Sequence, residues 1–383
     1  MNNKSKDSTA TLKVVCAILF IAFTFHYIYT FQGDLLGMMQ YAWSDGKTRY
    51  NREIGFGIIM AVALLLSFTT AFLTRLPQRF SSLIYFPAFL CMGLLTAVGQ
   101  EGTQVTTSMV WLIAAPVLFV LYIVLLRGVQ SFKPFLIPLR STTFLSQPWW
   151  TNLMVMTAMM LLTNAMGNSS RNLHTRLEVE RLCREQRWQD ALDAGIPSYD
   201  RDSSMTMLRA MALARQGLLG EHLFNYDVHG GSRALWQQKD NSACFLLGSP
   251  YILWQTIGVV PRNTSEPVAH FMKKQIRRHA IADCGKDYLL CAYLLDKDLS
   301  SFARELPKHY ALNDSLPKHY QEAYVLYAEK MSLTDSIVSS AVKADYADFL
   351  TTMRSKKNPT HRQSAIREAY FGTYWYYYYR QKE

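Results

Sequence analysis

Pro148–Gly167 reads PWWTNLMVMTAMMLLTNAMG and is the last long apolar run in the chain. Before it, apolar runs long enough to cross a bilayer alternate with short polar loops. After it, the pattern changes to the amphipathic helices of a water-soluble domain. We therefore interpret this run as the anchor that joins a membrane domain, residues 1–166, to an external domain, residues 167–383.

The composition agrees with two dissimilar halves in a chain of 383 residues. Residues up to Met166 carry 11 basic and 5 acidic side chains, whereas the remainder carries 29 basic and 24 acidic ones. The positive charge of the second half is thus spread among many acids, which argues against a nucleic-acid partner.

Five transmembrane helices are predicted, and their lengths lie near the roughly 20 residues that cross the hydrocarbon core. They cover residues 12–31, 54–73, 83–98, 107–126 and 149–166, the third being somewhat short. The first run exceeds the apolar core of a signal peptide, about 7–15 residues, and no small-residue cleavage site follows it. An uncleaved span is therefore favoured over a signal peptide.

The basic residues of the loops predict the orientation, because basic loops stay on the cytoplasmic side. A cytoplasmic N-terminus places eight of them inside, which are Lys4, Lys6, Lys13, Arg75, Arg79, Arg127, Lys133 and Arg140. Three lie outside, which are Lys47, Arg49 and Arg52. We expect a multi-pass protein of the bacterial inner membrane whose C-terminal domain is periplasmic in a diderm organism.

Two polar features of the membrane half are candidate sites. His26 lies in the first span, where an ionisable group is a functional candidate, although flanking aromatic residues fit an interfacial belt. Glu101 lies in Gly99–Gln104, which is either a plain outward turn or a ligand site. The spans contain no paired carboxylates or lysines of a proton relay.

The second half is predicted to be a degenerate array of helix pairs, similar to tetratricopeptide repeats. Trp188 and Leu219 occupy matching places 31 residues apart, close to the 34-residue period of those repeats. Helix pairs are expected at residues 173–195, 207–224, 288–305 and 317–353, with an irregular segment at 226–262. The fold class is therefore all-α, a five-helix transmembrane bundle followed by a helical-repeat domain.

Two further patterns lie near the C-terminus. The pentapeptide Leu-Pro-Lys-His-Tyr occurs at 306–310 and again at 316–320, as a duplication or by chance. Residues 370–379 read YFGTYWYYYY, which is too aromatic for a free tail. This segment either caps the last repeat or contacts the membrane interface.

Recognisable chemistry is absent from the sequence. There is no phosphate loop, nucleophile elbow or zinc-protease motif, so we predict no catalytic residue, cofactor or metal. Cys284 and Cys291, on one helix, would lie about 10 Å apart, too far for a disulfide. A pairing of Cys183 with Cys244 stays open.

Several segments together resemble a family of uncharacterised bacterial membrane proteins, known only as a domain of unknown function. The segments are Trp188 in its helix-turn setting, Ala212–Gly217, Leu223–Tyr226, Leu316–Ala323 and Gly372–Tyr377. The resemblance implies an envelope location and a tetratricopeptide-like domain, and it supplies no activity.

These observations favour a membrane-anchored scaffold that binds an envelope protein, because stacked helical repeats present extended surfaces for protein recognition. The candidate partner-binding residues are Arg184, Trp188, Arg215 and Tyr226. The alternative is an accessory subunit of an envelope transport or glycan-assembly system whose spans contact substrate, with His26 and Glu101 as its polar site. A weaker alternative is an enzyme with its site in residues 226–262.

Overall fold

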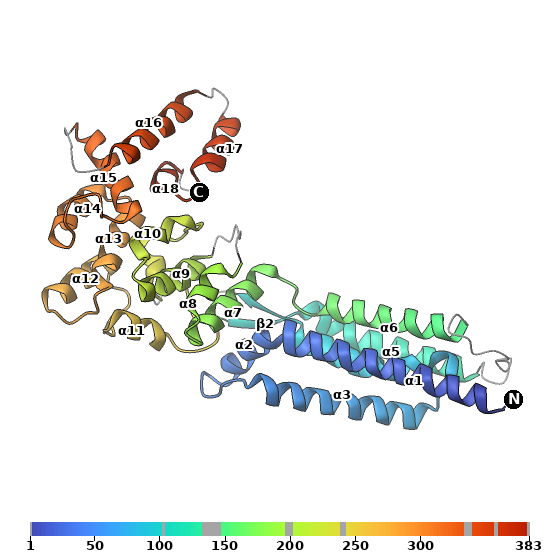
Figure 1. The fold of residues 1–383 in the computed structure, drawn as a ribbon. Coiled ribbons are helices and arrows are strands. Elements are labelled where there is room, and N and C mark those ends of the chain that lie inside the picture. The colour runs from blue at the N-terminus through green and yellow to red at the C-terminus, as the bar shows by residue number, and fades with distance from the viewer. Residues whose placement is uncertain are drawn as a thin grey trace. The chain divides into compact units, whose positions relative to one another are not determined.

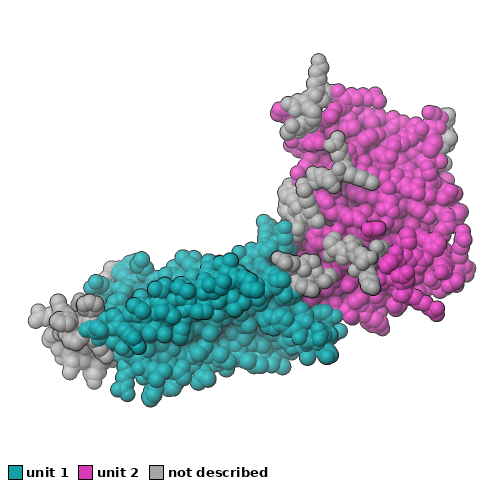
Figure 2. All heavy atoms as spheres, turned by 180° about the vertical axis from the view of Figure 1, so that it is seen from behind, with its two compact units in different colours: residues 1–174 teal, residues 175–383 magenta. Residues whose placement is uncertain are grey.

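The computed structural model of the chain describes residues 2–101, 104–131, 147–195, 202–237, 243–332, 339–355 and 359–380. Helices make up almost all of the described secondary structure. The chain divides into two compact units, Met1–His174 and Thr175–Glu383, which Figure 1 traces and Figure 2 colours separately. Each unit is described by itself below.

Unit 1 is built from apolar helices of very different lengths. Its long helices are α1 (Asn2–Thr24), which continues as the π-helix η1 (Phe25–Phe31), then α3 (Arg52–Thr74), α5 (Met109–Ser131) and α6 (Gln147–Met166). Its shorter elements are α2 (Gly33–Trp43), the 3₁₀ segment η2 (Gln78–Tyr85) and α4 (Phe86–Thr96). The axes of the long helices lie roughly side by side in Figure 1, with α3 running opposite to α1.

Three of the described helices are long and apolar enough to cross a membrane. They are Thr11–Phe31, Arg52–Thr74 and Met109–Ser131, and they coincide with the first, second and fourth predicted spans. Most of the apolar side chains of α3 and α5 are exposed, as expected for helices that face hydrocarbon. The chain therefore has the helices of a membrane protein.

The third predicted span differs from its expected form. Its α-helix covers only Phe86–Thr96, because residues before it form the 3₁₀ segment with a non-helical backbone at Phe80. After it, Val98 belongs to a strand rather than to the helix. The apolar helical stretch is Phe80–Thr96, which is shorter than the spans above.

Helix α6, the fifth predicted span, packs inside unit 1 through one face. Its buried side chains include Trp149, Asn152, Met156, Met159, Thr163 and Met166. Their alternating spacing of three and four residues is the pattern of a helix that buries a single stripe. The two polar members of the stripe, Asn152 and Thr163, are hydrogen-bonded, as buried polar groups require.

A β-hairpin replaces the plain turn expected at residues 99–104. Strands β1 (Val98–Glu101) and β2 (Gln104–Thr107) pair antiparallel, with Val98 opposite Thr107. The expectation of an all-α chain therefore needs this one small correction. Ala97 accepts a hydrogen bond from the backbone of Ser108 at 2.8 Å, which closes the base of the hairpin.

Unit 2 is a succession of shorter helices. The first part contains α7 (Arg171–Arg184), which crosses the division between the units, α8 (Trp188–Asp193), α9 (Ser203–Gln216), α10 (Leu219–His222), η4 (Leu223–Asn225), η5 (Gly231–Leu235) and α11 (Tyr251–Ile257). The second part contains α12 (Val268–Arg277), α13 (Gly285–Leu295), α14 (Leu299–Glu305), η6 (Leu306–Lys308), α15 (Lys318–Lys330), α16 (Ser340–Ser355), α17 (Pro359–Tyr370) and α18 (Tyr374–Tyr379).

Three of the predicted helix pairs are joined by turns of the same geometry. Gln186, Gly217 and Lys297 each adopt a left-handed backbone conformation after the first helix. In each pair the next N–H bonds to a carbonyl five residues earlier at 2.9 Å, and the second helix begins one residue later. This is the Schellman ending of a helix. Trp188, Leu219 and Leu299 therefore occupy equivalent positions.

The aromatic C-terminal segment folds back onto the domain as α18. Tyr374 and Trp375 are fully buried, and the indole of Trp375 donates to the carbonyl of Glu322 at 2.9 Å. The hydroxyl of Tyr377 donates to the carbonyl of Leu295 at 2.6 Å. Tyr376 to Tyr379 are half-buried.

Candidate functional sites

Trp188 and Arg215, two of the predicted partner-binding residues, lie against each other. The guanidinium of Arg215 is 5.7 Å from the centroid of the Trp188 ring, and its Nε donates to Thr256 Oγ1 at 2.9 Å. Trp188 is half-buried and Arg215 is exposed. The pair is therefore a preformed cation–π contact that solvent can reach.

Tyr226 lies near α8, the short helix that begins at Trp188, and is contacted from two sides. Its hydroxyl donates to the carbonyl of Leu192 in α8 at 3.5 Å. On its ring lies the guanidinium of Arg209, 4.5 Å from the centroid, and Arg209 is itself buried. Burial raises the pKa of Tyr226 and outweighs the nearby guanidinium of Arg209, which lowers it. The phenol therefore stays neutral at physiological pH.

Arg184 belongs to a separate structural contact. It donates to Oε1 of Glu180 at 2.8 Å and to the carbonyl of Ser249 at 3.2 Å. The fully buried Glu180 also accepts from the backbone N–H groups of Leu246 and Leu247, at 2.7 and 2.9 Å. Arg184 thus helps to fix an irregular loop onto α7, which is a structural role that its sequence position did not indicate.

The two polar candidates of the membrane half lie on different elements. His26 is exposed on η1, next to Phe25, whose ring stacks on Tyr29 with centroids 5.1 Å apart. Glu101 ends β1, and its side chain lies outside the described residues. In the part of unit 1 that the structure describes, His26 and Glu101 lie on separate elements, the helix η1 and the strand β1.

The hairpin borders a cavity of about 590 Å³ in unit 1, with both polar and apolar walls. The cavity is lined by Ala97, Val98, Gly99, Thr106, Thr107, Ser108, Met109, Trp111, Ala165, Met166, Gly167 and Asn168. Its wall is fixed by Asn168, whose amide nitrogen donates to the carbonyl of Val98 at 2.7 Å. Hydroxyl groups and an indole ring together suit a polar ligand that also offers an apolar face.

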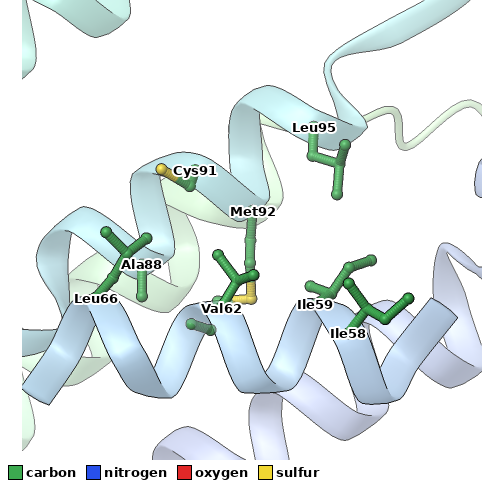
Figure 3. A pocket seen from close by; sticks show the side chains of 9 residues that line it. Ile58, Ile59, Val62, Leu66, Ala88, Cys91, Met92 and Leu95 are labelled. Carbon is green, nitrogen blue, oxygen red and sulfur yellow. The ribbon is translucent and has the colours of Figure 1, made fainter. Parts of the chain in front are cut away.

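A second hollow, about 220 Å³, lies between α3 and α4 and is entirely apolar (Figure 3). Its lining from α3 is Ile58, Ile59, Val62, Ala63 and Leu66, and its lining from α4 is Ala88, Cys91, Met92 and Leu95. In Figure 3, Met92 and Leu95 extend from α4 toward α3, and Val62 and Leu66 extend from α3 toward α4. Sequence reasoning missed this groove because its residues look like any apolar span.

A buried carboxyl in unit 2 also escaped sequence reasoning. Asp287 in α13 is 6% exposed and accepts hydrogen bonds from the hydroxyls of Tyr310 and Tyr320. Burial raises the pKa of Asp287 and outweighs the two phenol hydrogen bonds, which lower it. The two tyrosines end the two copies of the repeated pentapeptide, and that repetition was the only signal in the sequence.

The histidine of the second pentapeptide is part of another internal contact. His319 is fully buried, and its Nε2 accepts a hydrogen bond from the backbone N–H of Phe224 at 3.2 Å. Its Nδ1 therefore carries the proton and donates to Glu322 Oε2 at 3.0 Å. Glu322 Oε2 also accepts from the N–H of Tyr374 at 2.6 Å, so the pair connects three segments.

The cysteines of unit 2 favour a structural role. Cys183, Cys244, Cys284 and Cys291 are all free thiols, so the open pairing of Cys183 with Cys244 is not formed. Burial raises the pKa of Cys183 to about 12 and that of Cys284 to about 11, which disfavours the reactive thiolate. Among the described residues, no three His, Cys, Asp or Glu side chains are grouped as metal ligands would be.

Comparison with known proteins gives one result for the whole chain. A family of unknown function, DUF6057, matches residues 4–258 and 264–381. No curated protein and no solved structure matches the chain significantly. The match covers both units, so the membrane helices and the helical domain occur together in this family.

Proposed function

We propose that this chain, which belongs to the DUF6057 family of unknown function, is a membrane-anchored protein-interaction scaffold of the bacterial cell envelope without catalysis of its own. The observation that carries the proposal is the recurring turn after α7, α9 and α13. Repeated helix pairs with the same turn can stack, and stacked pairs present extended surfaces for protein partners. The domain is then a degenerate repeat array of tetratricopeptide type.

The proposed topology has five spans, a cytoplasmic N-terminus and a periplasmic C-terminal domain in the inner membrane. Three helices of spanning length support it, and α6 supplies a fourth helix of 20 residues that packs inside unit 1. The stretch Phe80–Thr96 would complete the set as a short, kinked span. The distribution of basic loop residues gives the direction.

The proposed recognition surface is centred on Trp188 and Arg215. Tryptophan and arginine are enriched among the residues that dominate binding energy at protein interfaces. At the equivalent positions of the next two helix pairs, Leu219 and Leu299 are buried, whereas Trp188 is only half-buried. The first pair therefore offers an aromatic side chain where the others bury a leucine.

Affinity copurification from native membranes in mild detergent tests this proposal. The full chain is compared with a variant carrying Trp188→Ala and Arg215→Ala, and bound proteins are identified by mass spectrometry. Tyr251→Ala is the matched control, because Tyr251 is an exposed aromatic residue on another helix, α11. A defined partner lost from the double variant and kept by the control supports the scaffold. Retention of all partners by a chain ending at Gly167 would contradict it.

The cavity beside the hairpin, with its hydroxyl groups and indole ring, favours a second candidate function, an accessory subunit of an envelope transport or glycan-assembly system. In that case the membrane half contacts a substrate whose polar part lies against Trp111 and the hydroxyls of Thr106 to Ser108. Thr107→Val, Glu101→Gln and His26→Ala would then abolish function in cells while the protein still accumulates and folds. A scaffold would tolerate all three substitutions.

A further inference from the structure

We infer that the α3–α4 groove is a binding site for one acyl chain of a bilayer phospholipid. This inference is independent of the scaffold proposal, since it concerns only the membrane half. It rests on the shape of the groove, the chemistry of its lining, its depth along α3 and the side chains at its rim.

Small side chains create the hollow. Ala63 of α3 and Ala88 of α4 line it and are 3% and 0% exposed, and with the buried Met92 they form its floor. At the rim, Ile58 and Val62 remain 60% and 50% exposed. The groove is therefore open along one side, and a slender ligand can enter it laterally.

The lining excludes water as the occupant. Eight of the nine lining residues have hydrocarbon or thioether side chains, and the ninth is Cys91. A bound water needs two to four polar partners, and empty polar-free cavities bind apolar molecules instead. Only an apolar ligand is matched to these walls.

The position of the groove along α3 favours the acyl chain of a lipid over its headgroup. A charged residue marks each end of α3. Arg52, its first residue, forms an ion pair with Asp34 at 2.6 Å, and Arg75 follows its last residue, Thr74. Ile58 lies about 9 Å beyond Arg52, and Leu66 lies about 13 Å before Arg75, at 1.5 Å per residue. The groove thus lies at hydrocarbon depth, where acyl chains are the abundant ligand.

The rim argues against a transmembrane helix of a second copy. Helices that associate in membranes approach through small residues at their contact. Here the alanines are buried, whereas the bulky side chains of Ile58, Val62 and Leu95 are more exposed along the groove. Such a surface keeps another helix backbone away but accommodates a single hydrocarbon chain.

Photocrosslinking tests the inference. The full chain is reconstituted in nanodiscs with a phospholipid that carries a diazirine near the middle of one acyl chain. After irradiation, crosslinked residues are mapped by mass spectrometry. We expect labelling of Val62, Cys91 and Met92 to be several-fold higher than labelling of the exposed α5 residues Val117, Leu121 and Val124, which report ordinary lipid contact.

Two variants make the outcome decisive. Ala88→Leu fills the floor of the groove, and Val62→Phe narrows its rim without touching the floor, so at least one variant is expected to fold. Val120→Phe on the exposed face of α5 is the matched control. Labelling of the groove residues should fall to the α5 level in the folded groove variants alone. Equal labelling of groove and α5 in the unaltered chain, or full labelling in the folded groove variants, would overturn the inference.

Discussion

Tyr310 and Tyr320 donate hydrogen bonds to the same oxygen, Oδ1 of Asp287, at 2.6 and 2.9 Å. Each tyrosine ends one copy of the pentapeptide Leu-Pro-Lys-His-Tyr. The first copy follows α14 and the second enters α15, so the shared acceptor fixes both segments to α13. The two copies of the pentapeptide are therefore both hydrogen-bonded to one buried carboxyl.

We expect Tyr310→Phe and Tyr320→Phe to destabilise the domain cooperatively. Each single change removes one donor while the other remains, which costs about 1 kcal/mol, or about 2–4 °C in a domain of this size. The double variant leaves the buried oxygen without either phenol and adds the larger cost of an unsatisfied group. Thermal unfolding of the purified full chain measures this. Strictly additive shifts would mean that the two hydrogen bonds are independent.

Asp287→Asn should change how stability depends on pH. Burial raises the pKa of Asp287, so the folded domain favours the neutral carboxyl. The stabilisation from this group is then fully present below the unfolded pKa, about 4, and is lost as pH rises through the folded pKa. The difference in Tm between the native chain and the variant should grow in favour of the native chain as pH falls from 7 to 4.5. Parallel curves of Tm against pH for the two proteins would contradict the raised pKa. Glu178→Gln is the control, because Glu178 is exposed.

Local signals in the sequence predicted much of the helical domain. The residues Trp188 and Leu219 were placed at equivalent positions, and both begin the second helix of a pair after the same turn. Such a turn depends on a few neighbouring residues, so its signal is local in the sequence. Three spans of sufficient length were predicted for the same reason, since length and hydropathy are local properties.

Contacts between distant segments could not be predicted. Asp287 meets partners 23 and 33 residues away, and Glu180 accepts from a loop 66 residues away. Which polar groups meet is decided by helix packing, and packing is not periodic in the sequence. For the same reason, the contact of Arg184 with the loop carbonyl of Ser249 could not be predicted.

Gly217→Ala should destabilise the domain through the backbone alone. Gly217 has a φ of +70°, and nothing lies within 4 Å of the position that a Cβ would occupy. Its substitution therefore adds strain without a clash, at about 1 kcal/mol. The reverse change, Gln186→Gly at the equivalent turn, should stabilise the domain by up to about 1 kcal/mol, because Gln186 has a φ of +60°. Thermal unfolding checks both, and shifts of the same sign would disprove the equivalence of the turns.

Asn152→Leu should loosen the membrane half although it makes α6 more apolar. The buried Asn152 accepts from the N–H of Ser82 at 2.8 Å and donates to the carbonyl of Pro148 at 2.8 Å. Interhelical hydrogen bonds in membranes contribute about 0.6–2 kcal/mol. Asn164→Leu is the matched control, because Asn164 is exposed on the same helix. Resistance to unfolding in detergent should fall only for the first variant, and equal behaviour would show that the Asn152 contacts contribute nothing.

Trp375→Ala distinguishes the two roles considered for the aromatic C-terminus. Trp375 is 2% exposed and packs on Tyr346 and Phe349, with ring centroids 5.1 and 6.1 Å away. Removing a buried ring of this size costs about 3–5 kcal/mol. If α18 is an internal cap, this loss appears equally in detergent and in nanodiscs of any lipid, because the lost contacts all lie within unit 2. A segment that contacts the membrane interface would instead lose stability only when lipid is present. Trp375→Phe keeps a ring but loses the indole donor to Glu322. Its stability should lie between those of the native chain and Trp375→Ala, as expected when packing outweighs one hydrogen bond.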